Sequence, residues 1–193
     1  MPRAPILYFD LGSPYSYLAV ERAPSVLGVD PELEPILLGA IFERRGHGSW
    51  AHTHDREWNI AEVERRAAAY GLPPVRWPPG WPPNTLQAMR VATWAKRHGS
   101  VRELALAAYR RAFVDGLDLG DLEVVVDVAA DAGLPSGEVR SAIAEPELKT
   151  ALRSATEAAW EAGVRGVPSM RVGSDVYFGD DRLTEAAAAL RIP

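Results

Sequence analysis

Two hydroxyl-bearing residues, Ser13 and Ser16, stand three positions apart where an apolar segment is followed by a helix-forming one. Ile6 to Phe9 are apolar or aromatic, which predicts a buried strand, and a helix is expected from roughly Tyr15 to Leu27. Ser13 suits the helix-capping position, and Pro14 suits the first helical position because its missing N–H would be unpaired there anyway. The N-terminus of a helix stabilises anions, a thiolate included. The pattern predicts a thiolate-stabilising position whose own residues carry hydroxyls.

The chain contains no cysteine. This excludes structural disulfides, cysteine-based zinc sites and a cysteine nucleophile. It also excludes dithiol exchange, which needs an attacking thiolate on the protein. Any sulfur chemistry at Ser13 is therefore expected to come from a bound small thiol.

Composition narrows the class of protein further. The 193 residues are 47% hydrophobic and 24% charged, as in ordinary globular proteins, and the net charge of −5 argues against nucleic-acid binding. No window approaches the run of about 20 apolar residues that a membrane helix requires. The first strand begins within about five residues, which leaves no room for a secretory signal. We expect a cytoplasmic protein that binds neither nucleic acid nor membranes.

His52 and His54 are residue types that bind metal ions, but no third ligand follows at a spacing typical of a metal site. A surface loop is the better prediction for this segment, and no metal site is expected.

The expected elements begin with a parallel βαβ unit, whose second strand is predicted over Glu34–Gly39 around Ile36-Leu37-Leu38. A hairpin over Ser169–Phe178 and a short helix over Thr184–Leu190 are expected at the end. Helical periodicity, capping residues and glycine or proline stops predict the helices between them: 58–70, 85–98, 101–114, 122–132, 137–144 and 146–162. The predicted class is α/β: a thioredoxin-like βαβ…ββα core (residues 1–41 and 164–193) with an all-helical inserted domain (residues 42–163).

Several motifs resemble one family. Ser13-Pro14-Tyr15-Ser16, Gly166-Val167-Pro168 and Phe178-Gly179-Asp180-Asp181-Arg182-Leu183 occur in the order found in 2-hydroxychromene-2-carboxylate isomerases and kappa-class glutathione transferases, members of the DsbA-like thioredoxin superfamily. Asn84-Thr85-Leu86 is similar to the start of that family's central helix. The resemblance covers nearly the whole chain.

The resemblance implies glutathione as cofactor and a set of residues that bind it. Ser13 could simply cap its helix, whereas the resemblance implies that its hydroxyl also donates to the sulfur. A cis Val167-Pro168 bond would present backbone groups to the thiol peptide, and Asp181 would receive the γ-glutamyl ammonium group. Asp180 stands where kappa-type relatives often carry Ser or Gln, and His47 lies near the position of a ligand-contacting Asn.

The substrate side is less defined by the sequence. Trp77 and Trp81 lie in a proline-rich loop that could pack on the helices, line a substrate pocket or bind another protein; packing is the preferred interpretation. Tyr15 and Asn84 are expected close to the sulfur position, where either could face a substrate.

The resemblance implies a glutathione-dependent cis-trans isomerase of small unsaturated aromatic oxo-acids, acting as a homodimer in aromatic compound catabolism. Two alternatives stay open. One is a kappa-like glutathione transferase or peroxidase that consumes glutathione, and the other is a peptide-binding module without catalysis. Another low-molecular-weight thiol could also replace glutathione.

Overall fold

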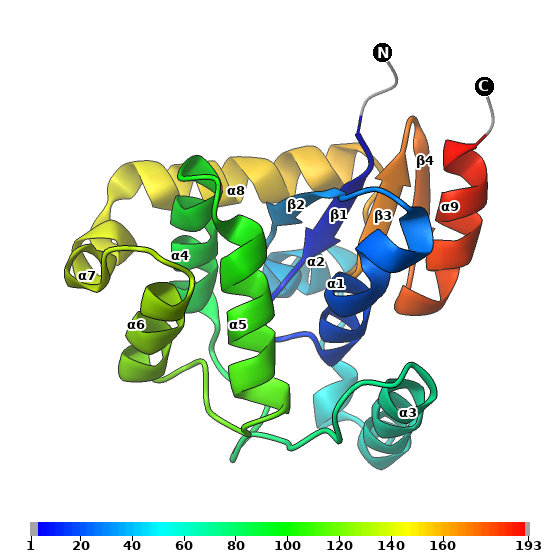
Figure 1. Ribbon diagram of the computed structural model, residues 1–193, viewed down its shortest axis with the longest axis horizontal. Helices are drawn as coiled ribbons and strands as arrows, with labels where there is room; N and C mark the ends of the chain where they lie inside the picture. Colours follow the sequence, from blue (N-terminus) through cyan, green and yellow to red (C-terminus); the bar gives the residue numbers. More distant parts are fainter. Residues whose placement is uncertain (1–3, 192–193) are drawn as a thin grey trace.

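The computed structural model describes residues 4–191. Four strands form one sheet in the order β2-β1-β3-β4 (Figure 1), with bounds β1 Ile6–Phe9, β2 Glu32–Pro35, β3 Ser169–Val172 and β4 Asp175–Phe178. β1 and β2 are parallel and are connected through the helix α1, Pro14–Leu27. β3 is antiparallel to both β1 and β4. The predicted βαβ unit and terminal hairpin are thereby confirmed, as is the thioredoxin-like class.

Of the seven helices described between β2 and β3, six follow the predicted order closely and one, α2, was not predicted. Their bounds are α2 Leu38–Arg45, α3 Arg56–Ala69, α4 Leu86–Arg97, α5 Val101–Phe113, α6 Leu122–Asp131, α7 Ser136–Ala144 and α8 Pro146–Glu161. The last helix, α9, spans Leu183–Leu190. Short 3₁₀ turns at Trp50–His52 and Asp180–Arg182 precede α3 and α9.

The second predicted strand was misplaced. β2 ends at Pro35, and Leu38 already begins α2. The backbone leaves the ladder because the amide of Leu37 donates to the Thr156 hydroxyl at 3.0 Å and that of Leu38 to the Asp10 carboxylate at 2.9 Å. Ile36 lies beyond the end of the strand and is fully buried. A short buried apolar run predicts a strand from sequence even where the backbone forms none, which explains the error.

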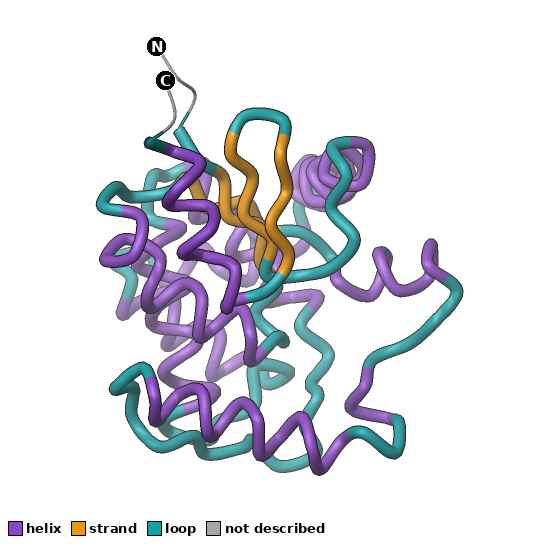
Figure 2. Tube along the Cα trace, turned by 90° about the vertical axis from the view of Figure 1, so that its right-hand side faces the viewer, coloured by secondary structure: helices purple, strands orange, loops and turns teal. Residues whose placement is uncertain are grey.

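Helices cover both faces of the sheet (Figure 2). The alternation of side chains along β1 sends Leu7 and Phe9 into one core and Tyr8 into another. The larger core continues from the sheet through α1 into the helices between β2 and β3, whereas the smaller one includes Ala159 of α8. The predicted domain boundaries at residues 41 and 164 remain a prediction, because the larger core contains residues from both sides of each boundary.

None of the helices within residues 4–191 has both the length and the apolar composition needed to cross a bilayer.

Candidate functional site

The turn from β1 into α1 places a buried hydroxyl at the start of a helix. Ser13 has an extended backbone and caps α1: its Oγ accepts from the amide of Ser16 at 3.2 Å. The Ser13 side chain is almost fully enclosed, with 5% of the residue exposed. Its hydroxyl donates no hydrogen bond to any residue between 4 and 191. The proton of Ser13 is therefore available to an acceptor at the positive end of the helix dipole.

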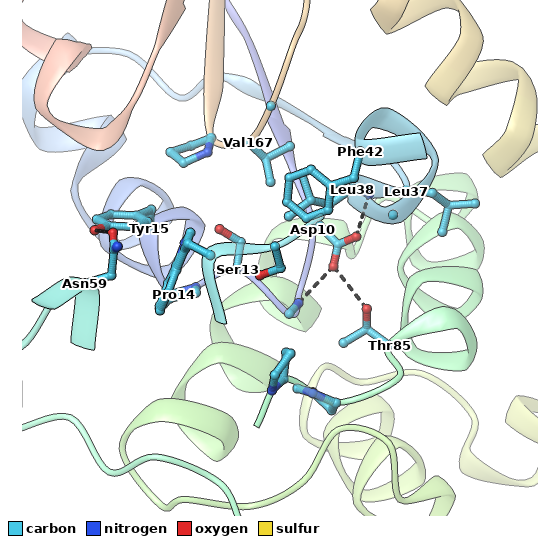
Figure 3. Close-up of a pocket in the computed structure, with 18 of the residues that line it drawn as sticks. Asp10, Ser13, Pro14, Tyr15, Leu37, Leu38, Phe42, Asn59, Thr85 and Val167 are labelled. Atoms are coloured by element: carbon cyan, nitrogen blue, oxygen red, sulfur yellow. Dashed lines mark hydrogen bonds between the residues drawn. The ribbon is translucent and has the colours of Figure 1, made fainter. Parts of the chain in front are cut away.

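Ser13 lies at the wall of a cavity of about 770 Å³, a size suited to a small-molecule ligand. The wall is built from seven segments: the turn from β1 into α1, the helix α2, the 3₁₀ turn at Trp50, the helix α3, the loop before α4, the loop before β3, and the turn before α9 (Figure 3). Apolar and aromatic side chains make up most of the cavity wall, among them Leu37, Leu38, Phe42, Trp50, Trp81 and Phe178.

Asp10, at the end of β1, joins three of these segments. Its carboxylate accepts from the amides of Gly12 and Leu38, each at 2.9 Å, and from the Thr85 hydroxyl at 3.1 Å (Figure 3). A side chain at Gly12 would press on Thr85, because an added Cβ would lie 3.2 Å from its methyl group. Burial raises the pKa of Asp10, although the two backbone hydrogen bonds act in the opposite direction. Asp10 therefore fixes the geometry around Ser13.

The loop before β3 forms the wall facing α1. The Val167-Pro168 bond is cis, as the resemblance implied, and Trp81-Pro82 is also cis. The Pro168 carbonyl accepts from the amide of Gly179 at 2.9 Å, while the amide and carbonyl of Val167 have no protein partner within the described chain. At Gly166 an added Cβ would meet the Phe178 ring at 2.6 Å, so only glycine lets that ring lie against the loop. An unpaired backbone edge thus lines the cavity.

Asp180 is buried in the cavity wall and held by arginines and a tyrosine. Its carboxylate accepts from Arg66 Nη1 at 2.8 Å and from the Tyr70 hydroxyl at 3.0 Å, with Arg22 Nη1 4.0 Å away. Burial raises the pKa of Asp180, against the lowering effect of Arg66. The neighbouring Asp181 is half exposed, and its Oδ2 lies 3.6 Å from Arg66 Nη1. The two acidic residues therefore differ: one is enclosed and paired, the other open.

Tyr15 occupies the wall beside Ser13. Its hydroxyl donates to Asn59 Oδ1 at 2.8 Å, and its ring packs edge-on against Trp50. Burial raises the pKa of Tyr15 to about 12, so the hydroxyl keeps its proton at neutral pH.

Most of the sequence-predicted site residues come together here. Those lining the cavity are Ser13, Tyr15, Trp81, Asn84, Val167, Pro168, Asp180 and Asp181. His47 lies outside the lining, exposed and tilted against Phe42. Trp77 lies behind Trp81 and donates from Nε1 to Glu64 at 2.8 Å, in keeping with the packing interpretation.

Three charged lining residues were not identified from the sequence: Asp10, Arg45 and Arg66. An acidic residue directly after a buried strand is the one local signal that could have indicated Asp10. Arg66 pairs with a residue 114 positions away, so no local pattern reveals it. Within residues 4–191 no cluster of three or more His, Asp or Glu could hold a metal ion.

Comparison with known proteins identifies relatives that match nearly the whole chain. The 2-hydroxychromene-2-carboxylate isomerase of Sphingobium xenophagum is 28% identical over 182 residues, which cover 91% of this chain and 92% of the relative. Human glutathione S-transferase kappa 1 is 24% identical, with 95% of this chain and 88% of the relative covered. These two relatives are enzymes by name.

A solved structure of 2-hydroxychromene-2-carboxylate isomerase superposes with a TM-score of 0.85 at 22% identity, over 96% of this chain and 93% of that one. This match shows the shared fold. The DSBA-like thioredoxin domain matches residues 6–191. The chain therefore belongs to the family of DSBA-like thioredoxin domains.

Proposed function

We propose that this protein is a glutathione-dependent cis-trans isomerase of small unsaturated aromatic oxo-acids, with a role in aromatic compound catabolism. The observation that carries the proposal is the Ser13 hydroxyl. It is enclosed at the N-terminus of α1 and donates to no described residue, in a chain that contains no cysteine. Such a position suits an anionic sulfur supplied by a ligand.

The residues present fit glutathione. The unpaired amide and carbonyl of Val167 suit the backbone of an extended thiol peptide, and the exposed carboxylate of Asp181 suits its ammonium group. Pro168 shapes the loop that carries Val167, and Asp180 belongs to the same end of the cavity. His47 lies close enough in sequence to the lining residues Arg45 and Ser49 for its loop to reach a ligand.

When bound, glutathione would supply the nucleophile for a reversible conjugate addition to the unsaturated substrate. Ser13 would donate to the sulfur and lower the pKa of the thiol, helped by the amides that begin α1. Tyr15, Trp81 and Asn84 would hold the substrate against the sulfur, and Trp77 would support Trp81. The apolar wall would exclude water and so strengthen these interactions.

Two alternatives differ in what happens to glutathione. A kappa-like transferase or peroxidase would consume it, and this alternative is supported by the human relative. A peptide-binding module without catalysis would use only the Val167 edge, which is supported by the unpaired backbone there.

The test is to follow a cis aromatic unsaturated 2-oxo acid by ultraviolet absorbance with and without glutathione, while measuring total free glutathione. The proposal predicts isomerisation that depends on glutathione and leaves its concentration constant. Loss of glutathione in proportion to product would favour the transferase. Isomerisation at the same rate without any thiol, or none with one, would contradict the proposal.

We further propose that the protein is a cytoplasmic homodimer, as its resemblance to the family implies. Light scattering would detect the dimer, and the mass of a single chain at working concentration would contradict it.

A further inference from the structure

Arg66 of α3 is held at the cavity wall by two of its three guanidinium nitrogens. Nε donates to Glu62 Oε1 at 2.7 Å, and Nη1 donates to Asp180 Oδ1 at 2.8 Å. The side chain is only 20% exposed. Nη2 donates to no residue between 4 and 191 and is not enclosed by protein. The guanidinium group is therefore fixed in place with one N–H₂ left for a ligand.

The charges around Arg66 balance. Three guanidinium groups and three carboxylates form one connected cluster: Arg22, Arg65, Arg66, Glu62, Asp180 and Asp181. A cluster without net charge offers little attraction to a lone carboxylate. It suits a zwitterion, whose carboxylate can accept from Arg66 while its ammonium group donates to a neighbouring carboxylate. Asp181 provides that carboxylate, with Oδ2 only 3.6 Å from Arg66 Nη1.

Arg45 is the other cationic residue of the cavity wall. It is exposed and held by a single hydrogen bond, from Nη1 to the Arg165 carbonyl at 2.8 Å. An exposed arginine loses more side-chain freedom when it binds a ligand than one that is already fixed. Arg66 is therefore the better placed of the two to discriminate between ligands.

We propose that Arg66 Nη2 binds the α-carboxylate of a thiol that carries a free α-amino acid group, and that this contact selects γ-glutamyl thiols over other small thiols. The inference rests on the proposed function and names the class of thiol used. Asp180 and Glu62 are then positioning residues for Arg66.

The first experiment needs no variant. Calorimetric titration of the wild-type protein would compare glutathione with its γ-glutamyl α-amide, in which an uncharged carboxamide replaces that carboxylate. Cysteinylglycine, which lacks the γ-glutamyl group, would serve as the third ligand. We expect glutathione to bind about 10- to 100-fold more tightly than the other two, as for a hydrogen-bonded charge pair.

The variants assign this preference to one side chain. Arg66→Lys keeps a cation beside Asp180 but removes the second N–H₂ group. It should lower the affinity for glutathione to that for the α-amide. The affinity for cysteinylglycine should stay unchanged. Arg65→Lys is the matched control, because Arg65 also pairs with Glu62 but is 65% exposed and lies outside the cavity lining, and lysine keeps the charge balance of the cluster. It should leave all three affinities unchanged.

Equal affinity of the wild-type protein for glutathione and its α-amide would overturn the assignment of Arg66 and leave the proposed function standing. Binding of none of the three thiols would overturn both. A loss of discrimination in Arg45→Gln with none in Arg66→Lys would assign the contact to Arg45 and overturn the proposal. So would an Arg66→Lys variant that binds thiols normally but has a raised KM for a carboxylate substrate.

Discussion

Ser13 combines a structural and a proposed chemical role in one side chain. As an acceptor, its oxygen caps α1 through the amide of Ser16; as a donor, it has no partner among the described residues. The two roles use different parts of the hydroxyl group, so they are compatible. They can be separated experimentally, because capping affects the free energy of unfolding whereas donation to a sulfur affects turnover.

Ser13→Ala should lower glutathione-dependent turnover by about 100-fold, the size of effect seen when one donor to a developing anion is removed. The loss of the helix cap should lower the free energy of unfolding by about 1 kcal/mol. Steady-state kinetics and urea denaturation measure the two effects separately.

Asp121→Ala is the control for this variant, since Asp121 caps α6 by accepting from the amide of Glu123 at 2.9 Å and lies outside the cavity lining. It should lose similar stability with normal turnover. Turnover in Ser13→Ala as high as in the control would refute the role assigned to Ser13.

Local sequence predicts the helix cap at Ser13 and the resemblance implies the cis bond at Pro168, but neither identifies the charged residues around them. A serine before a proline at a strand-to-helix turn is a local pattern, and so is Gly-Val-Pro before a hairpin. Asp10 and Arg66 acquire their roles from partners that the fold brings close, such as Thr85 and Asp180. The residues next to them in the sequence give no indication of these contacts.

The start of α2 depends on a carboxylate from another element. Leu37 precedes this helix and provides no side-chain cap, and Asp10 of the β1 end accepts from the amide of Leu38 instead. This contact explains why the apolar run at residues 36–38 turns into a helix. Periodicity alone favours a strand there, because three consecutive apolar residues carry no helical signature.

Asp10→Ala should lower the free energy of unfolding by about 1 kcal/mol, because three donors lose their acceptor, while the removal of a buried charge offsets part of that loss. Amide hydrogen exchange at Leu38 should become faster, since its hydrogen bond is lost. Exchange at Leu38 as slow as in the wild-type protein would show that Asp10 does not hold α2.

The ion pairs of Glu62 with Arg65 and Arg66 within α3 should make stability depend on acid pH. Hydrogen bonds from Arg65, and then from Arg66, lower the pKa of Glu62 from 4.5 to about 2. A lowered pKa in the folded state means stabilisation that is complete above the unfolded value and lost as the pH falls toward the folded one.

The melting temperature of Glu62→Gln should therefore lie below that of the wild-type protein by a constant amount above pH 4.5, and the difference should shrink as the pH falls toward about 2. Glu57→Gln, in the first turn of the same helix, is the control. A difference that does not change over this pH range would show that the Glu62 pairs do not contribute as ions.

The described part of the molecule is held together by a core that joins the sheet to the helices between β2 and β3. Leu7 and Leu18 belong to the same buried cluster as Leu104, Val128 and Leu148. The order of elements could be predicted from periodicity and stop signals, since these are local. How the helices pack could not, because that depends on side chains distant in sequence.

A variant in which residue 41 is joined directly to residue 164 should fail to fold cooperatively, because the sheet and α1 lose the apolar partners that cover them. Near-ultraviolet circular dichroism and urea denaturation would report this. A sharp, cooperative unfolding transition of the shortened chain would show that the thioredoxin-like part is independent of the helices.

The most direct measurement is an ultraviolet titration of glutathione thiolate in the presence of saturating protein. The pKa of the bound thiol should lie clearly below that of free glutathione, and Ser13→Ala should bring it back toward the free value. A bound thiol that titrates at the free value in the wild-type protein would contradict the account.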